Sequence, residues 1–261
     1  MIGKSIVEGF RFAFSFKRIL PYMALNFLLI FVVCDMLGRV GSLLTLSNDA
    51  IQSIAPFFGF YIFSFVLYLV LQPLFLGALL HQAKQFPKEK PIGDSFKFSF
   101  SVYLKTVVVF LILFCMFVLI GYVPYLWILF DPLFALASFY VFPAAIADNR
   151  GIRDSLKKSF EIFKKHSLQT FAVYLLIFLI SSILIISSFI PIVFWLAGNM
   201  FSLISQGVKN EIALVQSFAQ LLVSPTIIPL EIIPAFLLAF SSVMSIGIKA
   251  RLYFNLKKHR V

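Results

Sequence analysis

Charged side chains are scarce in this sequence, and acidic ones are scarcer than basic ones. Only 13% of the 261 residues are charged, whereas 61% are hydrophobic and the mean hydropathy is +1.00. Soluble domains carry roughly 25% charged and 45–50% apolar residues. Since so few polar side chains cannot cover an apolar core in water, the composition excludes an ordinary soluble fold and predicts an integral membrane protein.

The sequence also lacks the motifs of catalysis, nucleotide binding and metal binding. His81, His166 and His259 are far apart, and no pair has the spacing of metal ligands. Gly3-Lys4-Ser5 resembles the end of a phosphate-binding loop, but the earlier glycine of that motif is missing. No nucleophile elbow or zinc-protease motif occurs. We therefore expect no catalytic residue, cofactor or metal, and we favour a protein that is not an enzyme.

Cysteine is rare, and no cleavable leader is evident. Cys34 and Cys115 both lie in apolar runs, where we expect them to pack as small apolar side chains without forming a disulfide framework. The apolar run 19–34 follows Lys17-Arg18, as in a signal peptide, but no small-residue cleavage site follows it. We interpret this run as the first membrane span.

Long uncharged runs predict an all-α helical bundle with about six transmembrane helices, since a span needs about 20 apolar residues. The run 167–208 is long enough for two spans, so 192–208 could span, re-enter or lie on the outer surface. Its polar residues favour a surface-lying or re-entrant segment. The expected spans are 19–38, 57–80, 106–123, 126–147, 168–190 and 228–248.

The basic residues predict the orientation of these spans. The chain carries 22 Lys and Arg residues against 11 acids. In a six-span topology, all the cations except Arg39 and Lys209 fall on one side, which the positive-inside rule assigns to the cytoplasm. We therefore expect both termini in the cytoplasm, with the protein in the cell (plasma or inner) membrane. The excess positive charge then faces anionic inner-leaflet lipid, and we expect no nucleic-acid partner.

A short pattern recurs before each expected pair of spans. In the second and third copies, two serines lie four residues apart, Phe directly follows the second serine, and Lys follows at the same distance in both copies. In the first copy a Gly replaces the second serine. We predict a single membrane domain of three repeat units, near 1–90, 91–150 and 151–261, each a short amphipathic helix followed by two spans. Coincidence in a chain with 34 Phe residues is the alternative. The copies are Ser5-x-x-x-Gly9-Phe10, Ser95-x-x-x-Ser99-Phe100 and Ser155-x-x-x-Ser159-Phe160.

Basic amphipathic helices beside a span tend to lie in the headgroup layer. In the third segment we expect Ile152, Leu156, Phe160 and Phe163 to form the apolar face. In the second segment polar and apolar residues alternate, as in a strand, but we favour a helix by analogy with the other two segments. Each cation can contribute about 1 kcal/mol against anionic lipid, although the segments could simply cover the bundle. The candidate headgroup contacts are Lys4, Arg11, Arg18, Lys97, Lys105, Arg153, Lys157, Lys158, Lys164 and Lys165.

Glu231 is the candidate transport residue. It is flanked by Pro225, Pro229 and Pro234, and an acid in a proline-broken helix can bind a cation or a proton. The apolar run 232–248 that follows is about 25 Å long as a helix, which nearly fills the hydrocarbon core. We therefore place Glu231 at the outer interface, which weakens a transport role.

Residues 141–166 resemble the membrane domain found with some glycerophosphodiester phosphodiesterases and its stand-alone relatives of unknown function. Pro143 at the end of a span, Gly151 in a short loop, and Ser159-Phe160 in the following helix carry the resemblance. The aromatic and basic tail 251–257 is similar to the ending of that group. The resemblance implies a bundle of roughly this span count. It implies no activity, because the catalytic barrel is absent here.

These observations favour an uncharacterised multi-pass membrane protein, not an enzyme, that acts through lipid or protein contacts at the cytoplasmic leaflet. One alternative is a transporter or channel for a small or amphiphilic solute. Another is a membrane-embedded lipid-modifying enzyme.

The predicted orientation is tested by cysteine accessibility. In a background without Cys34 and Cys115, both Lys88→Cys and His259→Cys should react with a membrane-impermeant maleimide only after cells are opened, because both positions are expected in the cytoplasm. Labelling of the two positions from opposite faces of intact cells would contradict the topology.

Overall fold

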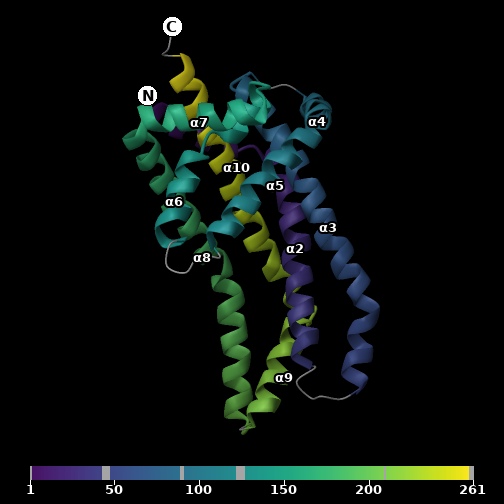
Figure 1. The fold of residues 1–261 in the computed structure, drawn as a ribbon. Coiled ribbons are helices and arrows are strands. Elements are labelled where there is room, and N and C mark those ends of the chain that lie inside the picture. Colours follow the sequence, from purple (N-terminus) through teal and green to yellow (C-terminus); the bar gives the residue numbers. More distant parts are fainter. Residues whose placement is uncertain (1, 43–47, 89–90, 122–126, 209, 259–261) are drawn as a thin grey trace. The chain divides into compact units, whose positions relative to one another are not determined.

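The computed structural model describes residues 2–42, 48–88, 91–121, 127–208 and 210–258. Within these ranges every regular element is a helix and no strand occurs, as the composition predicts (Figure 1). The second short segment is helical too, as favoured above. The elements are α1 (Ile2–Ala13), α2 (Phe16–Ser42), α3 (Asn48–Gln85), α4 (Ile92–Ser101), α5 (Tyr103–Gly121), α6 (Trp127–Ala137), the π-helix η2 (Pro143–Ala147), α7 (Ile152–Lys165), α8 (Ser167–Ser205), α9 (Glu211–Leu222) and α10 (Ile228–Lys258).

The chain is a multi-pass membrane protein by the length and composition of its helices. Four segments can cross a membrane, namely Phe16–Val40, Pro56–Gln85, Ser167–Ser205 and Ile228–Lys257. A fifth span results if α4 and α5, which are bent by 68°, are counted as one. Six spans are not confirmed, because α6 has only 11 residues and is about 16 Å long. Residues 122–126, between the predicted third and fourth spans, lie outside the described residues.

Helix α8 contains both the expected span 168–190 and most of the segment 192–208. It continues without a break from Ser167 to Ser205, so residues 192–205 extend the same helix and do not form a separate re-entrant or surface-lying segment. The polar side chains do not end the helix because they bond to its own turns: Asn199 donates to the carbonyl of Trp195 at 2.8 Å, and Ser205 donates to that of Ser202 at 2.7 Å. With 39 residues, α8 is about 58 Å long, nearly twice the thickness of a hydrocarbon core.

The chain divides into two compact units, each built from several segments. The first unit comprises Met1–Ile19, Gln72–Ser181 and Phe240–Val261, and the second comprises Leu20–Leu71 and Ser182–Ala239. The three repeat units predicted from the sequence are consecutive segments of the chain, unlike these two units. The repeat stays a prediction.

In the first unit, the three short helices pack through very small residues. Ser5 and Gly9 of α1, Ser95 and Ser99 of α4, and Ser155 and Ser159 of α7 are all buried. Gly9 lies against Ile248 of α10. The hydroxyl of Ser99 donates to the carbonyl of Leu74 in α3, and that of Ser159 donates to the carbonyl of Ala137 at the end of α6. Such residues let two helices approach closely.

The buried face of α7 differs from the expected one. Phe160, placed on the apolar face by its spacing, is 55% exposed, whereas Ser155, Ser159 and Ile162 are buried. The contact selects small side chains because a phenylalanine would hold the two backbones apart. Helix α7 is also one turn longer than α4, 14 residues against 10. Lys165 therefore ends α7, while Lys105 already belongs to α5.

The second unit contains a small apolar core of its own. Ile192 of α8, Leu222 of α9 and Ile227, just before α10, are buried together, and Trp195 packs against them. Gly38 of α2 approaches α9 so closely that a Cβ there would lie 2.7 Å from the carbonyl oxygen of Ala219. The N-terminal residues of α10 are therefore held beside α2 and α9.

The glycine contact of α1 gives a stability test with a control in the same helix. A Cβ on Gly9 would lie 2.8 Å from the backbone of Ile248, whereas one on Gly3 would meet nothing within 4 Å. Gly9→Ala should therefore destabilise the protein by about 1–3 kcal/mol and lower its thermal unfolding temperature in mild detergent. Gly3→Ala should be neutral or raise it, since alanine favours a helix by up to ~1 kcal/mol. Equal behaviour of the two variants would contradict the packing of α1.

Candidate functional site

The candidate headgroup cations occupy three kinds of environment. Seven of the side chains are exposed, two are half-buried, and one is buried. All ten belong to the first unit. The exposed ones are Lys4, Arg11, Lys97, Arg153, Lys157, Lys164 and Lys165; the half-buried ones are Lys105 and Lys158; the buried one is Arg18.

Arg18 is held inside the first unit and is only 6% exposed. Its Nε donates to Oε1 of Gln82 at 2.9 Å, and its Nη1 donates to the carbonyl of Phe12 at 2.8 Å. The guanidinium also lies 4.2 Å from the centre of the Phe12 ring. These contacts fix the junction of α1 and α2, so Arg18 is a structural residue in this arrangement.

The two half-buried lysines have protein partners. Lys105 donates to Oδ1 of Asn149 at 3.0 Å. Lys158 pairs with Glu161, three residues on in the same helix, at 3.5 Å. They are therefore less free than the exposed cations to meet a ligand.

The exposed cations share their helix faces with exposed large apolar side chains. In α7, Lys157, Phe160 and Lys164 follow one another at steps of three and four residues, which places them on one face. Leu168, in the first turn of α8, is also 79% exposed. We call each such row a basic–apolar stripe. The other two are Lys4, Val7 and Arg11 on α1, and Lys97 and Phe100 on α4.

Polar side chains also gather around Asp148, in the loop after η2. The side chain of Asp148 is 7% exposed. It accepts hydrogen bonds from the hydroxyl of Tyr253 and from Nζ of Lys257, both at 2.7 Å. Burial alone would raise the pKa of Asp148, but the bonds from Lys257 and Tyr253 outweigh it and hold the pKa below its ordinary value. This carboxylate therefore fastens the last turns of α10 to the loop.

A second contact fastens α10 to α1. Arg251 pairs with Glu8 at 2.6 Å and donates to the carbonyl of Phe86 at 2.8 Å. Asn255 donates to the buried hydroxyl of Ser5 at 2.8 Å. The aromatic and basic tail singled out in the sequence thus has a structural role within the first unit.

The second unit contains a group of ionisable side chains in apolar surroundings. Asp35 of α2 accepts from Nε of Arg39 at 2.9 Å and from the hydroxyl of Tyr61 at 2.5 Å. Glu231, in the first turn of α10, is only 1% exposed, and its Oε2 has no hydrogen-bond partner. Glu231 and Asp35 line one cavity of about 20 Å³. The sequence places Glu231 at the outer interface, but it gives no sign that α2 and α9 enclose it.

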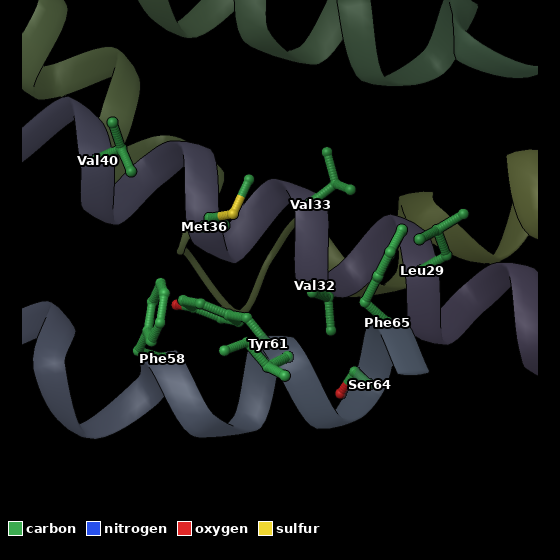
Figure 2. A pocket seen from close by; sticks show the side chains of 10 residues that line it. Leu29, Val32, Val33, Met36, Val40, Phe58, Tyr61, Ser64 and Phe65 are labelled. Atoms are coloured by element: carbon green, nitrogen blue, oxygen red, sulfur yellow. The ribbon is translucent and has the colours of Figure 1, made fainter. Parts of the chain in front are cut away.

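An apolar groove runs between α2 and α3 in the same unit (Figure 2). Its volume is about 480 Å³. The hydroxyls of Tyr61 and Ser64 are the polar side-chain groups among the lining residues, and Tyr61 also contacts Asp35. The wall otherwise consists of Leu29, Val32, Val33, Met36, Val40, Phe58, Ile62 and Phe65. Such a surface accepts hydrocarbon.

The sequence predictions miss the surroundings of Glu231. Arg39 is assigned to the outer side by charge alone, although the spacing of four residues between Asp35 and Arg39 is that of a helical ion pair. In the part of the chain that the structure describes, no group of three or more His, Cys, Asp or Glu side chains could hold a metal ion.

Comparisons with protein-family models, curated proteins and solved structures find no match for the chain. The resemblance of residues 141–166 to the phosphodiesterase-associated membrane domain therefore stays a prediction.

The Asp148 contacts predict a local, pH-dependent contribution to stability. Asp148→Asn should lower stability by about 1–3 kcal/mol, a range that allows for the half-exposed Lys257. Because the folded state depresses the pKa of Asp148, this contribution is complete above the ordinary value of 3.8 and is lost as the pH falls below it. The measurement is the unfolding temperature of both proteins from neutral to acid pH. Asp94→Asn, which changes an exposed acid, is the control. A decrease in the unfolding temperature of Asp148→Asn no larger than that of Asp94→Asn would contradict the role of Asp148.

Proposed function

We propose that this is a multi-pass membrane protein without enzymatic activity that binds anionic lipid headgroups through α1, α4 and α7 at the cytoplasmic leaflet of the cell membrane. The observation that carries the proposal is the basic–apolar stripe on each of these helices. A surface exposed only to water gains nothing from an exposed Phe160 or Phe100 beside its lysines. At a headgroup layer, the cations meet phosphates while the apolar side chains reach the acyl chains.

The packing of the short helices supports this proposal. Because Ser155 and Ser159 hold α7 against the bundle, Lys157 and Lys164 remain free on the outer face. Each cation near an anionic surface contributes about 1 kcal/mol. Several such residues on three helices together favour anionic over zwitterionic lipid.

The distribution of charge along the chain supports the orientation. The three stripes lie in the segments that the positive-inside rule assigns to the cytoplasm, where the membrane surface is negative. Both termini would then lie on the same side.

A transporter for a small or amphiphilic solute is the second candidate function. The observation in its favour is the buried Glu231, with the apolar groove of α2 and α3 in the same unit. Ionisable residues inside a membrane often mark a pathway. For the third alternative, a lipid-modifying enzyme, the nearest polar cluster uses its Asp148 carboxylate to hold α10.

The lipid proposal is tested by neutralising one stripe. The double variant Lys157→Gln/Lys164→Gln should retain less phosphatidylglycerol in native mass spectrometry, by up to about thirty-fold in affinity for two cations at about 1 kcal/mol each. Retention of phosphatidylcholine should not change. Lys158→Gln is the matched control, because Lys158 is half-buried and pairs with Glu161.

Two outcomes would contradict the proposal. One is a wild-type protein that retains the two lipids equally. The other is a loss of phosphatidylglycerol in the control as large as in the double variant.

A further inference from the structure

We propose that Glu231 is a proton-binding site in the apolar interior of the second unit, which exchanges its proton through the small cavity that it shares with Asp35. The inference is independent of lipid binding by the short helices. It rests on the burial of one carboxyl group, the lack of a counter-charge for it, and the presence of a small cavity beside it.

The surroundings of Glu231 disfavour a bare negative charge. Its carboxyl group is buried, and Oε2 has no hydrogen-bond partner. The cavity beside it is walled mainly by Phe31, Leu222, Val223, Ile227 and Ile228. An ionised carboxylate with an unbonded oxygen and no counter-charge is costly in such a medium, whereas a protonated carboxyl is a neutral polar group. The N-terminus of α10 favours an anion, but this effect is small beside the cost of burial.

The charges that face Glu231 do not supply a counter-ion. Arg39 is the one cation of the second unit within the described residues, and it pairs with Asp35. Asp35 also accepts from Tyr61 of α3. Cys34, next to Asp35 in α2, carries a thiol and supplies no positive charge. On α9, Glu211 is exposed at the far end of the helix from the cavity.

The cavity gives the proton a route. Its volume of about 20 Å³ has room for one water molecule, and its polar lining residues are Asp35, Ser224 and Glu231. Ser224 is half-buried, and its neighbour Val223 is exposed, so this side of the cavity lies close to the surface of the unit. A water molecule there can relay a proton from outside the unit, accepting one as it gives one to the carboxylate of Glu231, so that the carboxylic acid forms; the reverse relay releases the proton.

A single proton fits the site better than a metal cation. A hard cation needs several oxygen ligands, and Asp35 already accepts from Arg39 and Tyr61. The described residues also hold no cluster of three or more acidic, Cys or His side chains suited to a metal ion.

The experiment uses dicyclohexylcarbodiimide, an apolar reagent that attacks carboxyl groups in their protonated form. The full-length wild-type protein in phosphatidylcholine vesicles is treated near neutral pH and digested, and the adducts are located by mass spectrometry. We expect an adduct on Glu231 and none on Glu211, which is exposed to solvent. Glu231→Gln should lose the adduct, and Glu211→Gln should retain it.

Because the wild-type protein carries the main readout, the test does not depend on the folding of a variant. An adduct on Glu231 that is insensitive to sodium ions supports the proposal. Absence of the adduct at neutral pH would overturn it. The proposal would also be overturned if sodium ions protected Glu231 from modification and choline at the same concentration did not, since that result would identify a metal-cation site instead.

Discussion

Hydrocarbon as the surrounding solvent is the constraint on which the rest of this structure depends. Large apolar side chains point outward along most of α8, from Leu168 to Ile204, and along α5 from Leu104 to Leu119. In water such faces would drive aggregation, whereas in a bilayer they cost nothing. Helices are the elements that fit this solvent, because they satisfy their backbone hydrogen bonds internally. The all-helical fold follows from the composition for the same reason.

The same solvent determines where polar groups can lie. In the first unit two ion pairs join α10 to its neighbours: Asp148 pairs with Lys257, and Glu8 pairs with Arg251. These pairs fix the bundle, so the cations left over for a ligand are those on the outer faces of the short helices. In the second unit, Asp35 and Arg39 neutralise one another. Glu231 is left as a buried acid without a counter-charge.

The sequence predicts the fold class better than it predicts the contacts. Hydropathy alone indicates the long helices, because span length and apolar content are properties of single segments. The burial of Glu231 depends instead on Leu222 and Phe31, which reach it from α9 and α2. The buried face of α7 was mispredicted for a related reason. Spacing identifies a face, but the close approach at Ser159 selects small residues over Phe160.

The most direct test of the membrane account is a nitroxide scan along α8 in lipid vesicles. Spin labels would be placed one at a time at its outward positions, from Leu168 through Ile186 to Phe201, and their collisions with oxygen and with a water-soluble nickel complex compared. We expect a continuous stretch of about 20 residues in which the spin labels collide more often with oxygen than with the nickel complex, because that length spans the hydrocarbon core. Nickel access at every position would show that α8 lies in water and would contradict the account.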